Sequence, residues 1–149
     1  MEDNMYTIQT EASFDSAHFL KDYEGKCSNI HGHRWRVEVE LAAHSLKEEG
    51  AERGMIMDLT AVKERLRAEA DRLDHVLIVE EGSLKESTLK ALESENLRIV
   101  ILPFRPTSEN LAKYFFDCMK ETGCPVYRVR VFETPGNGAS YGERIPEDK

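Results

Sequence analysis

Three of the five histidines lie at positions from which their side chains could meet around one metal ion. His31 and His33 are two residues apart in a run of alternating apolar and polar residues, so in a β-strand both side chains point to the same face. His18 ends the apolar face of an earlier run with the same alternation. If the two strands pair as a hairpin, the three imidazoles offer three corners of a tetrahedron around Zn²⁺. We therefore predict a zinc site at His18, His31 and His33.

Cys27 lies four residues before His31 and allows two interpretations. As a fourth ligand, it would close a Cys-His₃ structural site around the metal. As a free thiolate beside an open His₃ site, it would act as a base or a nucleophile, and a nearby metal ion together with Lys26 would favour its ionised form. The spacing alone does not choose between the two.

Two carboxylates, Asp74 and Glu133, lie at positions that suggest a chemical role. Asp74 directly precedes His75, and a carboxylate beside an imidazole can orient the ring or hold its proton, which makes a relay. The alternative is a histidine that stabilises the C-terminus of a helix. Glu133 falls on the apolar face of a predicted strand, where a carboxylate is costly unless it is paired or receives a ligand. The N–H pair of a purine or pterin ring is such a ligand.

The first half of the chain predicts the strands that carry the histidines. Period-two alternation indicates antiparallel strands over residues 6–18 and 31–41, paired through the loop at residues 22–28. Residues 55–57 could extend the sheet, and Asp58 is then expected to be the N-cap of a helix. The apolar stripe of this helix consists of Leu59, Val62, Leu66, Ala70 and Leu73.

The second half predicts a helix between strands. Residues 80–96 are polar and indicate a loop with a short exposed helix, and residues 97–104 form a near-continuous apolar strand. A second helix starts at residues 106–108 and stops at Gly123. Strands follow over residues 126–134 and 139–144. The order of elements indicates an α+β domain, with an antiparallel sheet that carries helices on one face.

Composition restricts the class of protein. The 149 residues include 28 acidic and 20 basic side chains, for a formal net charge of −8, and 40% of them are hydrophobic. The length predicts one domain over residues 1–149, and the apolar content excludes disorder. A negative charge with few aromatic side chains argues against nucleic-acid binding, which needs cations to neutralise phosphates.

The sequence also indicates the compartment. There is no run of about 18 apolar residues, and the N-terminal stretch carries acidic residues in place of a basic start and an apolar centre, so we expect neither a transmembrane helix nor a secretory signal. The three cysteines make an odd number without the spacing of a disulfide framework. We therefore expect a reduced, cytoplasmic protein.

Taken together, these motifs resemble those of the pyruvoyl-tetrahydropterin synthase superfamily. Six pieces occur in the same order between residues 8 and 141: Phe14-Asp15-Ser16-Ala17-His18, Gly25-Lys26-Cys27, His31-Gly32-His33, Leu73-Asp74-His75, Pro106-Thr107-Ser108-Glu109-Asn110 and Phe132-Glu133-Thr134. The short spacing between Cys27 and the His-Gly-His triplet is similar to that of the 6-carboxy-tetrahydropterin synthases of the queuosine pathway.

The resemblance implies a tunnelling fold (T-fold), with an antiparallel four-stranded sheet core and two helices on one face. It also implies a homohexamer of two trimers with active sites between protomers. The implied roles of the site residues are zinc binding by His18, His31 and His33, general-base catalysis by Cys27, proton relay by Asp74 and His75, anchoring of the pterin ring by Glu133, and lining of the pterin pocket by Thr107, Ser108 and Glu109.

The implied reaction starts from 7,8-dihydroneopterin triphosphate and gives 6-carboxy-5,6,7,8-tetrahydropterin, acetaldehyde and triphosphate. Two rivals remain: the same elimination without carbon–carbon cleavage, which gives the pyruvoyl product, and a non-catalytic Cys-His₃ zinc module that stabilises an oligomer. A triphosphate also needs cations to offset the net charge of −8, and the candidates are Lys21, Lys26 and Arg34.

Overall fold

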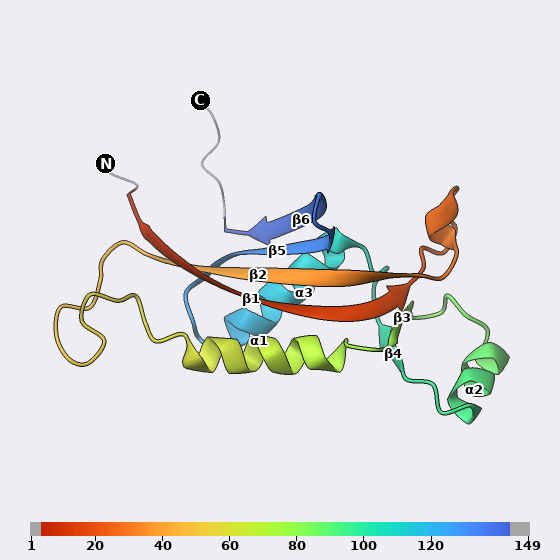
Figure 1. Ribbon diagram of the computed structural model, residues 1–149. Helices are drawn as coiled ribbons and strands as arrows, with labels where there is room; N and C mark the ends of the chain where they lie inside the picture. The colour runs from red at the N-terminus through yellow and green to blue at the C-terminus, as the bar shows by residue number, and fades with distance from the viewer. Residues whose placement is uncertain (1–3, 144–149) are drawn as a thin grey trace.

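The chain folds into a six-stranded sheet with helices packed on one face (Figure 1). The computed structural model describes residues 4–143. The strands are β1 (Tyr6–His18), β2 (His31–Ala43), β3 (Leu77–Glu80), β4 (Ile99–Leu102), β5 (Val126–Thr134) and β6 (Asn137–Gly142). The helices are α1 (Thr60–Arg72), α2 (Glu86–Ser94) and α3 (Ser108–Glu121), and a short 3₁₀ helix covers Lys26–Ser28.

The two longest strands form the predicted antiparallel hairpin. β1 and β2 pair along their whole length, from Tyr6 opposite Ala43 to His18 opposite His31. β5 adds to the other edge of β2 and β6 adds to β5, both antiparallel. Because the side chains of a strand alternate between its faces, this register gives the hairpin one apolar and one polar face.

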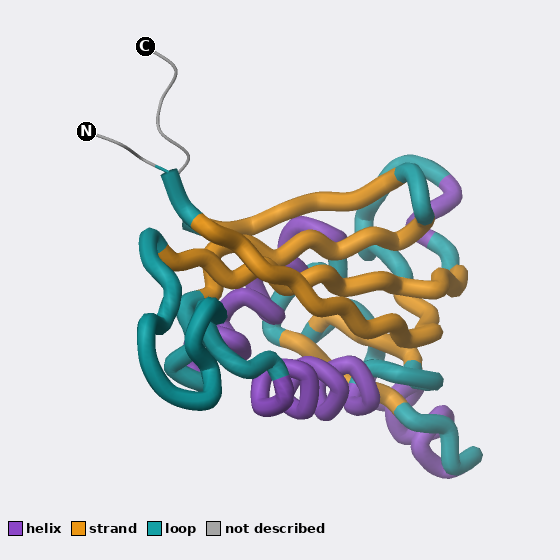
Figure 2. Tube along the Cα trace, turned by 60° about the vertical axis from the view of Figure 1, so that its left-hand side comes forward, coloured by secondary structure: helices purple, strands orange, loops and turns teal. Residues whose placement is uncertain are grey.

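The apolar face of the sheet forms the core with α1 and α3. Figure 2 shows the strands as one layer with these helices beneath it. Phe14 and Trp35 stack in parallel from adjacent strands, and Phe14 also stacks on Phe115 of α3. The predicted helical stripe is buried through Val62, Leu66 and Ala70 of α1. The expected α+β arrangement, with these two helices on one face, is therefore confirmed.

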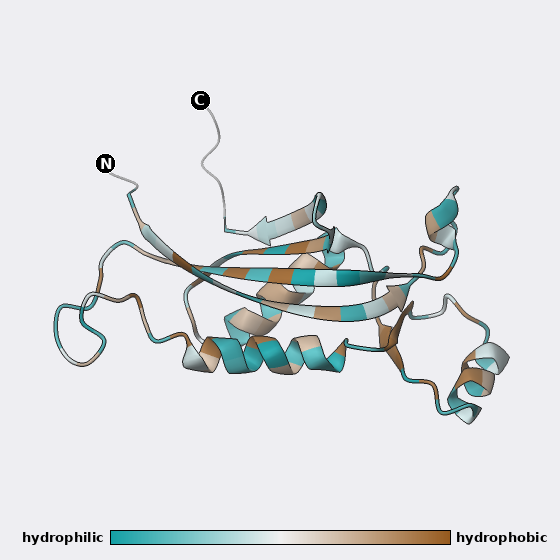
Figure 3. Ribbon diagram, in the orientation of Figure 1, coloured by the Kyte–Doolittle hydropathy of each residue, from teal (hydrophilic) through white to brown (hydrophobic). Residues whose placement is uncertain are grey.

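The predicted four-stranded antiparallel sheet is wrong in strand number and in direction. The sheet has the order β4-β3-β1-β2-β5-β6, and β3 runs parallel both to β1 and to β4. β3 has four residues and contacts β1 through one pair, Ala17 opposite Leu77. A run this short has no measurable period, so the sequence pattern missed it. Figure 3 shows β3 and β4 as predominantly hydrophobic; the two central residues of β3 are buried, whereas Ile101 of β4 is exposed.

Two of four smaller predictions differ from the structure. Residues 55–57 lie in the loop before α1 and do not extend the sheet. The N-cap of α1 is Leu59 instead of Asp58, although the Asp58 carboxylate accepts the backbone N–H of Thr60 at 2.8 Å. The short exposed helix predicted within residues 80–96 is α2, which has no buried residue. The last predicted strand is β6, and its expected end at Arg144 lies outside the described residues.

The helix-free face of β1, β2 and β5 carries alternating charges. Arg36 pairs with Glu38 and with Glu11, and Arg130 pairs with Glu40 at 3.4 Å. Opposite charges on neighbouring strands stabilise the pairing of those strands. Within residues 4–143, no helix is both long enough and apolar enough to cross a membrane.

Candidate metal centre

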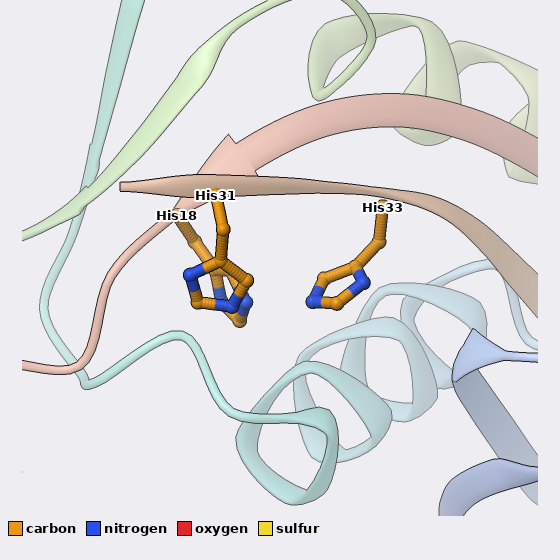
Figure 4. A group of neighbouring side chains, drawn as sticks. All are labelled: His18, His31 and His33. Atoms are coloured by element: carbon orange, nitrogen blue, oxygen red, sulfur yellow. The ribbon is translucent and has the colours of Figure 1, made fainter. Parts of the chain in front are cut away.

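The hairpin brings His18, His31 and His33 together at one end of the sheet. His18 lies opposite His31 and Ser16 lies opposite His33, so all three rings project from the face that the helices cover. One nitrogen from each ring lies within 4.8 Å of the others. Figure 4 shows the three rings beneath the strands, on the side where α3 begins. The juxtaposition predicted from the spacing is therefore present.

Backbone carbonyls fix how two of these rings point. Nδ1 of His18 lies 2.7 Å from the carbonyl oxygen of Pro106, and Nδ1 of His31 lies 2.7 Å from that of Asn29. A carbonyl oxygen only accepts hydrogen bonds, so each Nδ1 carries the proton. In the neutral ring Nε2 then keeps a free lone pair, and metal-binding histidines are held in this way by partners of their other nitrogen.

The inward-facing nitrogens have no hydrogen-bond partner. Nε2 of His18, His31 and His33 is buried and unpaired within the described part of the chain. The pKa of His18 is lowered to about 4, first because burial disfavours the charged ring and then because His31 and His33 lie beside it. Burial also lowers the pKa of His33. Neutral, unpaired imidazoles are the donor set that zinc and related divalent ions prefer, so these residues fit a metal ion.

Glu133 lies beside the histidines and is held by a buried serine. Its Oε2 atom is 3.1 Å from Nε2 of His33, in an orientation that does not make a hydrogen bond. Its Oε1 atom accepts the hydroxyl of Ser108 at 3.1 Å, and Ser108 is 3% exposed. About a third of the Glu133 side chain is exposed, so one side of the carboxylate is open to a ligand. The sequence placed this carboxylate on the apolar face of its strand, but not against His33.

Of the three residues expected to line the pterin pocket, Thr107, Ser108 and Glu109, only one contacts Glu133. Thr107 is the N-cap of α3, and its hydroxyl accepts the backbone N–H of Asn110 at 3.2 Å. Glu109 is exposed in the first turn. Ser108 is therefore the member of the Thr107-Ser108-Glu109 turn that contacts Glu133. The sequence could not predict that the carbonyls of Pro106 and Asn29 bind the histidine rings, because every residue has a backbone carbonyl.

Cys27 lies outside the three-histidine cluster. It belongs to the 3₁₀ helix and is partly exposed, and its backbone carbonyl accepts the N–H of Leu20 at 2.8 Å. The candidate metal group in the described residues contains three histidines and no thiol. The arrangement is that of an open His₃ site instead of a closed Cys-His₃ site.

Asp74 and His75 form the predicted pair, but at the edge of β1. Oδ2 of Asp74 accepts Nδ1–H of His75 at 2.8 Å, and Oδ1 accepts the backbone N–H of Asp15 at 2.8 Å. These two bonds, the Asp15 one first, lower the pKa of Asp74. The His75 backbone N–H donates to the Asp15 carbonyl at 2.6 Å, and about three quarters of its side chain is exposed. Within residues 4–143, no hydrogen bond or ion pair joins this pair to the metal cluster.

The fold and the site together define an α+β protein with three histidines that could hold a metal ion and an adjacent, fixed carboxylate. The chain belongs to the 6-pyruvoyl tetrahydropterin synthase family, whose profile matches residues 7–144. The family resemblance of the sequence motifs is thereby confirmed.

Relatives in sequence and in structure agree with this assignment. The chain is 32% identical over 142 residues to the 6-carboxy-5,6,7,8-tetrahydropterin synthase of Haemophilus influenzae, covering 93% of this chain and 100% of the relative. It is 34% identical over 139 residues to the protein of the same name from a Synechocystis species, covering 92% and 93%.

Solved structures match over nearly the whole length of both chains. An uncharacterized protein from Wolinella succinogenes superposes with a TM-score of 0.75 at 21% identity, covering 95% of this chain and 100% of that one. The 6-pyruvoyl tetrahydropterin synthase of Caenorhabditis elegans superposes with a TM-score of 0.67 at 24% identity, covering 95% and 97%. At these identities the likeness shows the T-fold alone.

Proposed function

We propose that the protein is a zinc-dependent lyase, a 6-carboxy-5,6,7,8-tetrahydropterin synthase of queuosine (7-deazapurine) biosynthesis. Its substrate would be 7,8-dihydroneopterin triphosphate, and its products 6-carboxy-5,6,7,8-tetrahydropterin, acetaldehyde and triphosphate. The names of the sequence relatives support this reaction. The observation that carries the proposal is the group of three unpaired imidazole nitrogens beside a carboxylate that Ser108 holds in place.

His18, His31 and His33 would hold the zinc ion. When bound there, zinc supplies Lewis acidity toward the hydroxyl groups of the substrate side chain. Glu133 is open on one side and would accept two N–H groups from the pterin ring, with Thr107, Ser108 and Glu109 along the edge of this pocket. Since Glu133 lies beside His33 of its own chain, we assign the ring anchor and the metal ligands of one site to the same protomer.

Proton transfer falls to Cys27, Asp74 and His75. The Cys27 thiolate would remove a carbon-bound proton from the substrate side chain, and His75, oriented by Asp74, would move the hydroxyl proton. Because Asp74 and His75 are not joined to the metal cluster of their own chain, we infer that a neighbouring chain brings them to it. This inference supports a homo-oligomer with sites between protomers, and we propose a hexamer of two trimers.

The proposed reaction balances with one added water. Elimination of triphosphate leaves a two-carbonyl side chain that ends in a methyl group. Cleavage of the bond between the two carbonyl carbons consumes one water molecule, which gives a carboxylate on the ring and releases acetaldehyde. Without this second step, the product would be the pyruvoyl compound of the rival reaction. The family description and the name of the Caenorhabditis elegans protein refer to that product.

The free cysteines and the composition support proposals about the compartment and the partners of the enzyme. The three cysteines are free in the structure, which supports a reducing compartment, and we propose a cytoplasmic enzyme. We further propose that residues 1–149 act as one domain, with a small-molecule pterin triphosphate as the partner and neither nucleic acid nor membrane involved.

A mass-spectrometric product assay of the zinc-loaded protein with 7,8-dihydroneopterin triphosphate tests the proposal. We expect 6-carboxytetrahydropterin and acetaldehyde in equal amounts. A pyruvoyl product would keep the site and change the reaction. No turnover by fully zinc-loaded protein would contradict the substrate assignment.

A Cys27→Ala variant separates the enzyme from the non-catalytic module. Because Cys27 lies outside the metal cluster, we expect the Cys27→Ala variant to retain zinc. Its kcat should fall at least about 100-fold, because the proposed base is missing. Cys124→Ser, which changes a thiol outside the proposed site, is the matched control and should keep both zinc and turnover. Loss of zinc together with folding in Cys27→Ala would instead establish the closed Cys-His₃ module.

A further inference from the structure

The proposed substrate carries a triphosphate, and the site must supply cations for it in a chain with a net charge of −8. The structure removes one candidate, because Nε and Nη2 of Arg34 donate to both carboxylate oxygens of Asp15 at 2.9 and 3.0 Å. The Asp15 carboxylate offsets the charge of this guanidinium, so it attracts a phosphate less strongly than an unpaired arginine does. The polyphosphate partner must be sought elsewhere.

Arg105 lies close to the histidine cluster, and its guanidinium has no acidic partner in the described part of the chain. It directly precedes Pro106, whose carbonyl holds His18. Its Nη2 donates to the backbone carbonyl of Lys21 at 2.7 Å, whereas its Nε is buried without a hydrogen-bond partner. Within residues 4–143, no carboxylate pairs with it. An arginine with free donors and no acidic partner is suited to bind an anion.

A cavity lies beside two residues that Arg105 contacts, Lys21 and Tyr23. Its volume is about 540 Å³, and its walls include Lys21, Tyr23 and Asn29. The Arg105 guanidinium lies over the Tyr23 ring, 5.9 Å from the centroid, while the Asn29 carbonyl holds His31. Lys21 therefore gives the lining of the cavity one positive charge, and Asn29 connects this lining to His31. Asp22 also lines the cavity, so one cation and one carboxylate face this space, and Arg105 contacts its lining residues Lys21 and Tyr23.

We propose that Arg105, together with Lys21, forms the subsite for the polyphosphate chain of the substrate. The proposal rests on the proposed function, because it assigns one part of that substrate to a cavity. The free N–H groups of Arg105 donate to phosphate oxygens, and the Lys21 ammonium adds a second positive charge. The pterin ring then lies at Glu133 and the triphosphate lies on the far side of the metal centre.

Calorimetric titration with inorganic tripolyphosphate tests the subsite directly. An excess of Mg²⁺ keeps tripolyphosphate from removing zinc, and elemental analysis verifies the metal content. For Arg105→Gln we expect binding at least about 10-fold weaker than wild type, and a similar rise in KM for 7,8-dihydroneopterin triphosphate. The affinity for 7,8-dihydroneopterin, which has no phosphate, should not change.

Arg53→Gln is the matched control. Arg53 also donates to a backbone carbonyl, that of Gly50 at 3.1 Å, and no carboxylate in the described part of the chain pairs with it. It lies in the loop between β2 and α1, at the end of the sheet away from the end of β1 (Figure 1). The variant has the same change in charge and should bind tripolyphosphate as wild type does.

Several outcomes would overturn the subsite. Unchanged tripolyphosphate binding in Arg105→Gln would do so, as would equal weakening in Arg53→Gln, which would show an effect of net charge alone. An equal loss of affinity for 7,8-dihydroneopterin would show that Arg105 only supports its loop. If Arg105→Gln does not fold, Arg105→Lys keeps the charge and loses the forked donors, and unchanged binding by that variant overturns the role of the guanidinium. Arginine-dependent tripolyphosphate binding without pterin turnover would keep the anion site and refute the proposed function.

Discussion

At the scale of single residues, the site depends on which ring nitrogen of each histidine and which carboxylate oxygen of Glu133 is left free for a ligand. The carbonyls of Pro106 and Asn29 hold Nδ1 of His18 and His31, so both rings present Nε2 to the same point. Glu133 is fixed in a comparable way, through one oxygen by Ser108, which leaves the rest of the carboxylate for a ligand. Neutral backbone and hydroxyl partners orient these groups without cancelling their charge or their lone pairs.

Ser108→Ala should weaken substrate binding more than it slows turnover. Without the hydroxyl, Glu133 loses the hydrogen bond that orients it, so we expect KM for the pterin substrate to rise about 10-fold with a smaller change in kcat. Zinc content should stay the same. Steady-state kinetics and elemental analysis measure these quantities.

Two further variants complete this test. Ser108→Thr restores a hydroxyl and should recover most of the affinity. Ser94→Ala removes a serine that donates to the Ala91 carbonyl in α2, and it should behave as wild type. An unchanged KM in Ser108→Ala would show that Glu133 does not need this partner.

The sequence predicted the identity of the site residues better than their contacts. The three histidines could be placed together because strand alternation and a hairpin fix their faces. The hydrogen-bond partner of His18 could not be predicted, since Pro106 lies 88 residues away and acts through its backbone carbonyl, a group that every residue has. The pairing of Arg34 with Asp15 was equally hidden, because it depends on the register of β1 against β2.

At the scale of the elements, long patterned segments were predictable and short ones were not. β1 and β2 have 13 residues each, enough for period two to be unmistakable. β3 has four residues, and its pairing with β1 and β4 is decided by contacts between distant parts of the chain. For the same reason Met55 and its neighbours, apolar in sequence, lie in a loop instead of the sheet.

The contact between α1 and α3 includes a partly buried phenol that gives a measurable pH dependence. The Tyr114 hydroxyl donates to Glu69 at 2.8 Å and accepts from Arg72 at 3.0 Å. Burial first, and then the hydrogen bond to Glu69, raises the pKa of Tyr114 above its usual value of 10.0. Above about pH 10 the unfolded chain ionises this phenol and the folded chain does not, so stability must fall as the pH rises.

Tyr114→Phe should therefore be less stable than wild type at neutral pH but lose this pH dependence. We expect a deficit of about 1 kcal/mol at pH 8 in urea unfolding, because two hydrogen bonds are lost. The deficit should narrow above about pH 10, where only the wild type is penalised for keeping its phenol neutral. A constant difference across this range would contradict the raised pKa.

At the scale of the whole molecule, metal binding should add to stability. The three buried nitrogens have no partner in the described structure, and an ion that binds only the folded chain stabilises it by mass action, by about 4 kcal/mol at 1,000 times its dissociation constant. We expect a chelator to lower the thermal unfolding temperature of wild type by several degrees. The His33→Ala variant should respond much less, and an equal response would show that the chelated metal lies elsewhere.

Assembly should be required for activity, because Asp74 and His75 are not joined to the metal cluster of their own chain. Native mass spectrometry of the zinc protein is expected to show six copies of the 17.1 kDa chain, about 103 kDa. Mixing inactive Cys27→Ala and His75→Ala chains should restore part of the activity, since some mixed sites then contain both groups. An active monomer would refute shared sites.

The pairing of His18 opposite His31 also has a consequence for how the chain folds. Successive side chains of a strand point to opposite faces, so a slip of β1 by one residue would turn His18 away from His31 and His33. A misaligned hairpin then has two ligands instead of three and gains little from the metal. Zinc bound during refolding would stabilise the native alignment selectively, so the ion proposed for chemistry would also select the correct strand register.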